Sequence, residues 1–377
     1  MIPVFRQDNL IEALPRIEAA LDSGWVAANG QYVDEATEKL TKLLNVSGVI
    51  LVNSGTAAMH LVSKAVQYKY LEVEYIVVPS CASVYAWNPW LYDSKYKLLP
   101  MDVDLDTWNI NADLLKYVLE SGYCDKKVAV CAVHTLGGVM DVPNLRYCLP
   151  ETVFVEDCCD CFLGSYAHGK VGTQSLCGAF SFYGNSNVTA GEGGALVTNN
   201  DEVYAHLSRT KGKCFVEDPT LPTLLEYNYS MTNLHAAVLC DQLGRYDELS
   251  LVKNAVHNTY REILADVENV SYQKDTKWLR NANWTFAVRI KYSKGPHEAR
   301  EFLASRGIDC RPMYQSMYYY DHLRQYTKPK YERNARILAR EVIVLPSYPG
   351  LSCAEIEYIC SVVEAYAQKC EMEMRNG

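Results

Sequence analysis

Short apolar runs alternate with longer stretches of helical pattern through the first two-thirds of the chain. The runs are rich in Val, Ile and Phe and are too short for helices, which predicts strands. Segments of helical length separate them, such as Ala57–Val66 and Ala112–Leu119. This alternation predicts an α/β domain built on a mostly parallel, seven-stranded sheet flanked by helices. The expected strands are Gly48–Val52, Tyr75–Val78, Lys97–Leu99, Val128–Val133, Thr152–Val155, Ala179–Tyr183 and Ala195–Thr198.

The pattern changes towards the C-terminus. The stretch from His235 to Val267 is largely helical in pattern, and it is followed by an expected strand at Trp284–Ile290. Further helices are expected at Pro296–Arg306 and Cys353–Ala367. A chain of 377 residues is long enough for more than one domain. We therefore predict a large α/β domain at residues 1–245 and a smaller C-terminal α+β domain at residues 246–377.

Composition and charge narrow the class of protein. Hydrophobic residues make up 49% and charged residues 21% of the chain, which is typical of soluble globular proteins. The formal net charge of −9 argues against nucleic acid or an anionic membrane surface as the main partner. No apolar run has the length of a membrane span, and Pro3, Arg6 and Asp8 interrupt the apolar core that a signal peptide needs. We expect a cytoplasmic protein.

The 14 cysteines fit reduced thiols better than a disulfide framework, because they are scattered through a long chain with no secretory leader. The densest cluster is Cys158, Cys159 and Cys161, with His168 further on. A zinc site would need a second pair of ligands, which the sequence does not offer. We expect buried structural thiols here and no metal.

Candidate chemistry lies where the predicted strands end, which is where open α/β sheets bind ligands. Asn53–Ala58 follows a strand and opens a helix, so its amides could bind an oxyanion or simply cap the helix. Asp157 also follows a strand, where an acid can keep a ring nitrogen protonated or act as a helix cap. The Gly-rich stretch 184–194 permits tight turns beside a ligand, or it is only a loop between strands.

Taken in order, these segments resemble the DegT/StrS family of sugar aminotransferases, which are fold-type-I pyridoxal phosphate enzymes. The resemblance runs nearly end to end and implies the aminotransferase fold. Function has to be argued from the site, because one scaffold serves several chemistries. The matching segments are Ile2–Val4, Ser23–Trp25, Asn53–Ala58, Asp102–Asp104, Asn109 with Ile110, His134–Gly137, Val155–Asp157, Ser181–Tyr183, Gly191–Gly194, Tyr227–Tyr229 and Leu345–Pro349.

The resemblance implies a site for pyridoxal phosphate or pyridoxamine phosphate, and a nucleotide-linked sugar as substrate. Gly55 and Thr56 match a helix start whose amides bind the cofactor phosphate, and Ser181 matches a serine that adds a hydroxyl. Asp157 matches the acid that pairs with the pyridinium nitrogen and keeps the ring an electron sink. Asn228 matches an asparagine that reaches the phosphate of the neighbouring subunit, which implies a homodimer with shared sites.

The most consequential departure from the family pattern is Ser186. The family's cofactor lysine falls two residues after Gly184, in a register fixed by Gly191–Gly194, and serine stands at that position. A lysine forms an imine with the cofactor and moves protons, whereas a serine hydroxyl forms no imine and is a poor base. Loss of the acid–base group alone costs on the order of 10²–10⁴ in rate. We therefore expect a non-covalently held cofactor or none.

Further departures surround the same implied pocket. Ser83 stands where the family usually has an aromatic ring that stacks on the cofactor, although Tyr85 and Trp87 are close enough to compensate. Ser230 stands where arginine is common. Asp160 replaces a glutamine or glutamate, which shortens its reach to the cofactor's ring oxygen. Several changes around one pocket favour a natural change of use over a single engineered substitution.

Other residues are candidates to replace the lysine. Lys211 and Lys213 belong to a loop that the family places near the edge of the pocket, and the alternative is solvated surface charge. His134 is a candidate base, or a strand-end histidine whose ring is satisfied by the backbone. The tyrosine-rich stretch Met313–Tyr320 either lines a substrate cleft or packs between domains.

Three hypotheses about function remain open from the sequence. The first is an altered enzyme that acts on a nucleotide-linked 4-keto-deoxy sugar, in the manner of family 3-dehydratases that carry histidine at the lysine position. The second is a non-catalytic pseudoenzyme that binds a ligand or a partner. The third is a laboratory variant of an ordinary sugar aminotransferase. We do not expect ordinary transamination with serine at position 186.

Overall fold

The computed structural model describes residues 1–7, 10–121, 127–212 and 225–376. Seven strands form the main sheet, in which β9 runs antiparallel to both neighbours and the other six run in one direction. The predicted mostly parallel sheet is confirmed, and no strand end differs from its prediction by more than two residues. In sheet order the strands are β1 (Gly48–Val52), β9 (Gly194–Thr198), β8 (Gly178–Ser181), β5 (Val153–Asp157), β4 (Val128–Val133), β2 (Tyr75–Pro79) and β3 (Lys97–Met101).

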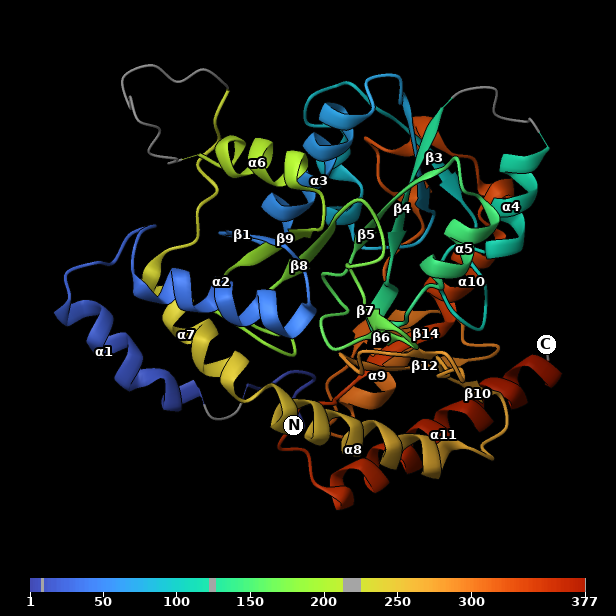
Figure 1. Ribbon diagram of the computed structural model, residues 1–377. Coiled ribbons are helices and arrows are strands. Elements are labelled where there is room, and N and C mark those ends of the chain that lie inside the picture. The colour runs from blue at the N-terminus through green and yellow to red at the C-terminus, as the bar shows by residue number, and fades with distance from the viewer. Residues whose placement is uncertain (8–9, 122–126, 213–224, 377) are drawn as a thin grey trace.

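Helices cover both faces of this sheet (Figure 1). Alternate residues of β1 enter different hydrophobic clusters, with Leu51 in the first and Ile50 in the second. The first cluster is completed by α2 and α7, and the second by α3 and α6. Burial on both faces explains why the strands are apolar throughout. The helices of this part are α1 (Leu14–Asp22), α2 (Gln31–Leu44), α3 (Gly55–Lys69), α4 (Ala112–Glu120), α5 (Val142–Cys148), α6 (Asp201–Thr210) and α7 (Asn233–Gly244).

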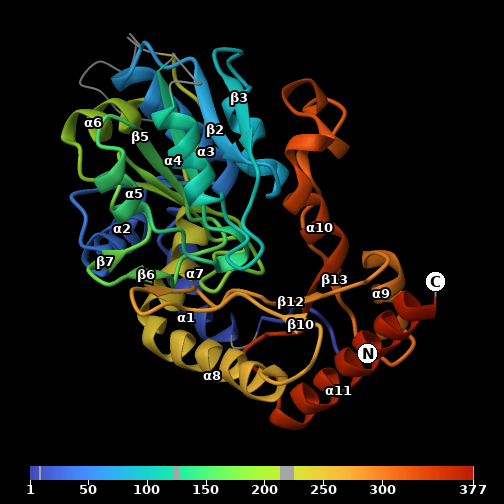
Figure 2. The same ribbon diagram turned by 90° about the vertical axis from the view of Figure 1, so that its right-hand side faces the viewer.

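A second, four-stranded antiparallel sheet follows, with its own hydrophobic cluster. Figure 2 shows α8 and α11 crossing on the far side of this part from the main sheet. The predicted boundary at residue 245 stays a prediction; α8 begins at the next residue. In sheet order the strands are β10 (Val270–Ser271), β12 (Phe286–Ile290), β14 (Val342–Leu345) and β13 (Arg311–Pro312), and the helices are α8 (Tyr246–Leu264), α9 (Pro296–Ala304), α10 (Arg333–Glu341) and α11 (Cys353–Asn376).

A small three-stranded sheet joins the two parts. Its order is β11 (Leu279–Arg280), β6 (Ser165–Tyr166) and β7 (Gly169–Lys170), so a strand from the C-terminal part pairs with a hairpin of the first part. The predicted end of the last helix was wrong, because α11 continues from Ala367 to Asn376. This polar extension is supported by ion pairs four residues apart, such as Lys369 with Glu373.

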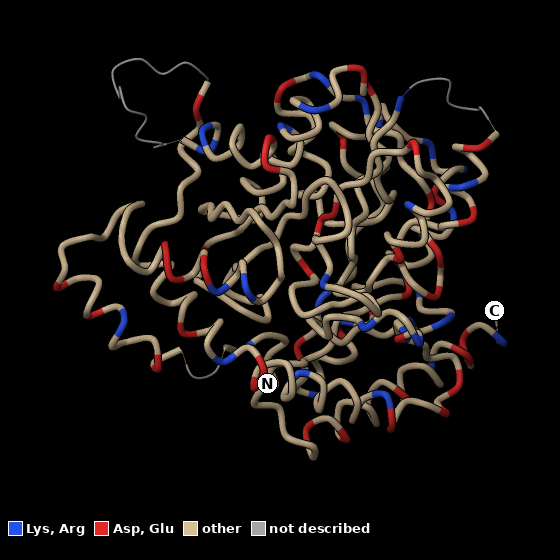
Figure 3. Tube along the Cα trace, in the orientation of Figure 1, with Lys and Arg blue, Asp and Glu red and all other residues tan. Residues whose placement is uncertain are grey.

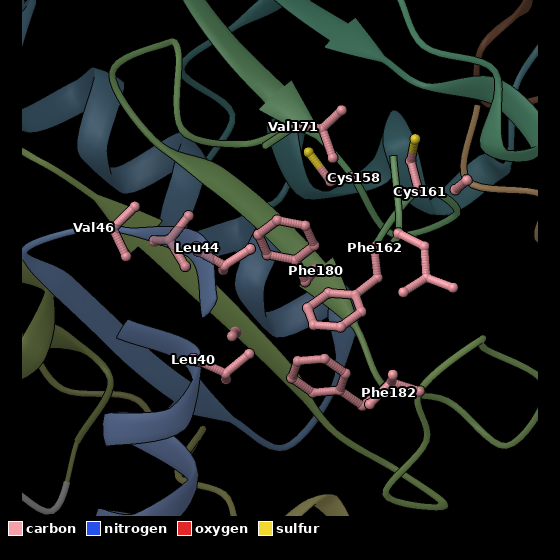
Figure 4. Packing of buried hydrophobic residues seen from close by; sticks show 14 of the residues in the cluster. Leu40, Leu44, Val46, Cys158, Cys161, Phe162, Val171, Phe180 and Phe182 are labelled. Atoms are coloured by element: carbon pink, nitrogen blue, oxygen red, sulfur yellow. The ribbon is translucent and has the colours of Figure 1, made fainter. Parts of the chain in front are cut away.

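The thiols of the cysteine cluster are part of the core. Cys158 and Cys161 lie beside Phe162 and Phe180 in the first hydrophobic cluster (Figure 4). Burial raises the pKa of both thiols well above its usual value, so they stay protonated and unreactive. The twelve cysteines in the described ranges are all free thiols.

The surface carries charges of both signs. Lys and Arg are interspersed with Asp and Glu along the trace (Figure 3). Among the helices of the described residues, none combines the length and the apolar character needed to cross a membrane.

Candidate active site

A cavity of about 570 Å³ opens at the carboxyl ends of the parallel strands. This is the edge at which open α/β sheets bind ligands. Trp284 and Tyr314 come from the C-terminal part and also line the cavity. The segments that line it from the main sheet are Ser54–Thr56 after β1, Ser83–Ala86 after β2, Val133 with His134 after β4, Asp157–Asp160 after β5, and Ser181–Ser186 after β8.

One end of the cavity is the N-terminus of α3. Ser54 caps this helix by accepting a hydrogen bond from the Ala57 amide at 3.1 Å. The amides of Gly55 and Thr56 have no acceptor within the helix, as is usual for a first turn. A Cβ at position 55 would lie 2.7 Å from the Ser181 Cβ, so only glycine lets the helix start approach this serine. The result is a cradle of donors suited to a phosphate.

Two carboxyl groups lie at the end of β5. Asp157 is buried and accepts the Cys159 amide at 3.1 Å, and burial raises its pKa. Asp160 accepts the Tyr314 hydroxyl at 2.9 Å and the Leu136 amide at 3.3 Å. Burial, and then the Asp157 carboxylate, raise the pKa of Asp160 to about 7. No lysine or arginine in the described ranges lines the cavity, so these carboxylates favour a cationic ligand group such as a protonated ring nitrogen.

Ser186 lies in the cavity wall with 6% of its surface exposed. Backbone contacts fix it, because its amide donates to the Tyr183 carbonyl at 2.9 Å and its own carbonyl accepts from Gln7 Nε2 at 2.9 Å. The Trp284 indole holds the neighbouring Asn185 carbonyl at 2.8 Å. The match of Ser186 to the family's lysine stays a prediction, but its side chain does lie among the other predicted site residues.

His134 is satisfied on both ring nitrogens. Its Nδ1 accepts the Met140 amide at 3.0 Å, so the proton is on Nε2, which lies 3.3 Å from Glu156 Oε2. This arrangement supports the structural reading of His134 over the role of a free base. His134, Glu156 and Cys158 present possible metal ligands within 4.8 Å of one another. Glu156 already accepts four hydrogen bonds, so hydrogen bonding explains the cluster without a metal.

The structure separates the two aromatic candidates near Ser83. Ser83 and Tyr85 both line the cavity, and Tyr85 is 60% exposed. Trp87 is fully buried, donates to the Pro79 carbonyl at 2.9 Å and packs on Tyr320. Only Tyr85 is therefore placed to contact a ligand.

Asn228 lies outside the cavity wall and is exposed. Asn53 positions its segment, since the Asn53 side chain donates to the Asn228 carbonyl at 3.2 Å and the Asn53 amide donates to the Tyr229 carbonyl at 2.7 Å. Ser230 donates to the Gly212 carbonyl at 3.1 Å and is likewise absent from the cavity wall.

The lysine candidates do not enter the cavity within the described residues. Lys211 is the C-cap residue that follows α6, and its carbonyl accepts the Tyr229 amide at 3.0 Å. Lys213 lies outside the described residues. The tyrosine-rich stretch was expected either to line a substrate cleft or to pack between domains, and its residues do different things. Tyr314 lines the cavity, whereas Met317 and Tyr320 pack in the second hydrophobic cluster.

Sequence reasoning missed Trp284 as a cavity residue and did not single out Tyr314. Trp284 was expected to begin a strand, but β12 starts at Phe286 and leaves the indole in the preceding turn. Both residues reach the cavity by long-range packing, so no local motif marks them.

Comparison with known proteins agrees with this geometry. GDP-perosamine synthase of Escherichia coli O157:H7 is 28% identical over 374 residues, covering 98% of this chain and 99% of that protein. The apo form of the putative sugar aminotransferase Spr1654 from Streptococcus pneumoniae superposes with a TM-score of 0.90 at 18% identity, over 99% of both chains. An E. coli GDP-4-keto-6-deoxy-D-mannose-3-dehydratase with bound hydrated PLP superposes with a TM-score of 0.87 at 20% identity, over 96% of this chain and 99% of that one.

The family pattern covers most of the chain. Residues 8–364 match the DegT/DnrJ/EryC1/StrS aminotransferase family. Together with the fold-type-I architecture, this match confirms the resemblance seen in the sequence. The chain belongs to the DegT/DnrJ/EryC1/StrS aminotransferase family.

Proposed function

We propose that this chain holds pyridoxamine phosphate or pyridoxal phosphate non-covalently and acts on a nucleotide-linked 4-keto-deoxy sugar. One observation carries the proposal. A single cavity combines an anion cradle at the start of α3, a buried acid at Asp157 and a hydroxyl, not an amine, at Ser186. The first two features fit the phosphate and the ring nitrogen of the cofactor, and the third removes the covalent link.

The residues that line the cavity would bind different parts of the cofactor and the sugar. The Gly55 and Thr56 amides and the Ser181 hydroxyl would bind the phosphate, and Asp157 would hold the proton on the ring nitrogen. The cofactor, when bound, supplies an amine and an electron-withdrawing ring. Tyr85 and Tyr183 are 60% and 52% exposed at the cavity wall, where aromatic faces suit a sugar.

The relatives support the substrate class. Two GDP-perosamine synthases, from E. coli O157:H7 and Vibrio cholerae, are each 28% identical to the chain over nearly its full length. These relatives are named for a GDP-linked sugar, which favours a GDP-linked keto sugar as the first substrate to test.

The proposal is tested by adding each form of the cofactor separately and following calorimetry and visible absorption before and after dialysis. We expect both forms to bind, and borohydride to leave the protein mass unchanged with pyridoxal phosphate. Ser186→Lys is the matched variant, in which borohydride should add the mass of the reduced cofactor to the protein. Mass spectrometry of products then follows incubation of the wild type with GDP-linked 4-keto-6-deoxy sugars.

Absence of binding by either form at millimolar concentration would sink the proposal and favour the pseudoenzyme. A wild-type protein that transaminates as fast as Ser186→Lys would also contradict it, because the hydroxyl would then be no handicap.

We also propose a homodimer with shared sites. Asn228 is exposed and is held at the end of β1, as a residue that serves a second subunit requires. Large apolar side chains are exposed along the N-terminal segment, including Ile11 at 74% and Trp25 at 60%. Light scattering should give twice the chain mass of 42.6 kDa. Asn228→Ala should keep that mass and weaken binding of pyridoxamine phosphate, whereas a monomeric wild type would contradict the proposal.

A further inference from the structure

We propose that Asp160, held by Tyr314, is the proton-transfer residue of the cavity and performs the acid–base work that the Ser186 hydroxyl cannot. This inference rests on the proposed function, because it concerns the same cavity and the same ligands. It assigns a catalytic role to a position that the family pattern leaves to a longer side chain.

The geometry leaves one carboxyl oxygen of Asp160 free for a ligand. The Tyr314 hydroxyl and the Leu136 amide both donate to Oδ2, at 2.9 and 3.3 Å. Within the described residues, Oδ1 therefore keeps its hydrogen-bonding capacity for the cavity, which Asp160 lines together with Ser186. Tyr314 follows β13 by two residues, and its carbonyl accepts a hydrogen bond from the Cys81 thiol at 3.1 Å, which holds this segment beside the end of β2.

Burial and neighbouring groups together hold Asp160 between its two protonation states. Burial favours the neutral carboxyl most, and the negative charge of Asp157, three residues away in sequence, adds to this effect. The Tyr314 hydroxyl and the Leu136 amide stabilise the carboxylate. The net result is a pKa of about 7, which suits a group that both donates and accepts protons near neutrality. The other titratable groups at the cavity wall are His134, Cys159, Tyr85, Tyr183 and Glu192.

None of these groups combines a shielded position with a free proton-transfer atom, and Tyr85, Tyr183 and Glu192 are exposed. His134 has both ring nitrogens engaged. Burial raises the pKa of the Cys159 thiol well above its usual value, so a thiolate is not available. Asp157 is committed to the ring nitrogen in the proposed function.

The proton-transfer step balances without an oxidant or a reductant. The Oδ1–H bond of neutral Asp160 breaks as its proton passes to the carbonyl oxygen of the bound keto sugar. The cofactor, when bound, would supply the amine whose lone pair forms the new bond to the carbonyl carbon, and the former C=O π pair would form the new O–H bond. The Asp160 carboxylate that remains is stabilised by Tyr314 and Leu136, and it regains a proton from the amine nitrogen.

The first test follows the protonation of Asp160 in cofactor-free protein by infrared difference spectroscopy, subtracting Asp160→Asn from wild type. We expect a protonated carboxyl band that disappears with a midpoint near pH 7. Tyr314→Phe should raise the midpoint, because it removes a donor to the carboxylate, and Asp157→Asn should lower it, because it removes the like charge. Asp113→Asn, at an exposed site on α4, is the matched control and should change nothing.

The second test counts the protons released when pyridoxamine phosphate binds, by calorimetry at pH 7 in two buffers of different ionisation enthalpy. Wild type should release roughly half a proton more than Asp160→Asn, because the cationic ligand shifts a half-protonated Asp160 towards the carboxylate. Asp160→Glu should restore the release, and binding of pyridoxamine phosphate by Asp160→Asn in the same titrations shows that the asparagine variant is folded.

The outcomes separate the inference from the proposed function. A midpoint near the ordinary aspartate value of about 4, or equal proton release by wild type and Asp160→Asn, would overturn the inference while cofactor binding stands. Failure of the wild type to bind pyridoxamine phosphate would overturn both.

Discussion

Glu156 and Asp157 are consecutive residues at the end of β5, and their side chains face opposite sides of the sheet. Glu156 is fully buried and accepts hydrogen bonds from His134, Tyr166 and the amides of Gly172 and Gln174. Burial opposes ionisation of Glu156, but the hydrogen bonds from His134, Tyr166 and the Gly172 amide outweigh it and lower the pKa of this carboxyl.

Asp157 receives far less support. It accepts one amide, from Cys159, and burial raises its pKa. The difference shows how one strand end serves two purposes. A carboxylate with a full set of donors stabilises the fold, whereas a buried carboxylate without them is held ready for a ligand that supplies the missing positive charge.

The largest effect is expected from Asp157→Asn. Removing this charge should weaken binding of pyridoxamine phosphate by roughly a hundredfold or more, because breaking a buried ion pair costs about 3 kcal/mol or more. The cofactor-free variant should be at least as stable as wild type at pH 7, since ionisation of Asp157 is disfavoured in the folded state. Calorimetry measures the affinity for pyridoxamine phosphate, and urea unfolding measures the stability of the cofactor-free protein. Unchanged affinity would place the positive charge of the ligand elsewhere.

Glu156→Gln should have the opposite effects, lowering the stability of the protein and leaving its affinity for the cofactor nearly unchanged. An amide at this position turns an NH₂ group towards existing donors, so the free energy of unfolding should fall by about 3 kcal/mol. Affinity for pyridoxamine phosphate should change little, because the side chain faces away from the ligand. Urea unfolding at pH 7 measures the first quantity. If this variant lost affinity but kept its stability, the contrast between the two residues would be wrong.

The fold and half of the site could be predicted because their signals are local. Buried strands are apolar throughout, and Gly55 and Asp157 stand at strand ends, where parallel sheets bind ligands. Tyr314 could not be predicted in the same way. It meets Asp160 across 154 residues of sequence, and only the packing of the C-terminal part against the first part brings them together. The full support of Glu156 was hidden for the same reason, since the donors of its hydrogen bonds come from other turns and strands.

Asp160 allows a test through pH. Its folded pKa of about 7 lies above the ordinary aspartate value, so between those values the folded protein binds more protons than the unfolded chain. The contribution of Asp160 to the free energy of unfolding should therefore decrease as pH rises from about 4 to 7. Asp160→Asn should remove this decrease, which amounts to about 3 kcal/mol between pH 4 and pH 7. Urea unfolding of cofactor-free protein across that range measures it, and parallel curves for both proteins would contradict the prediction.

Tyr166→Phe is the smallest change and the most discriminating. The Tyr166 hydroxyl donates to Glu156 Oε2 at 2.5 Å, and three other donors to this carboxylate remain when it is lost. We expect a loss of about 1.5 kcal/mol, half of the cost of Glu156→Gln, measured by urea unfolding.

The double variant with Asp157→Asn then measures whether the two sides of β5 are independent. Additive stability changes, to within about 0.5 kcal/mol, would mean that the donors around Glu156 act on the fold alone. A larger coupling would mean that the charge of Asp157 interacts energetically with the hydrogen bonds on the other side of β5. In that case Glu156 and its donors would help to set the affinity of the cavity for its ligand.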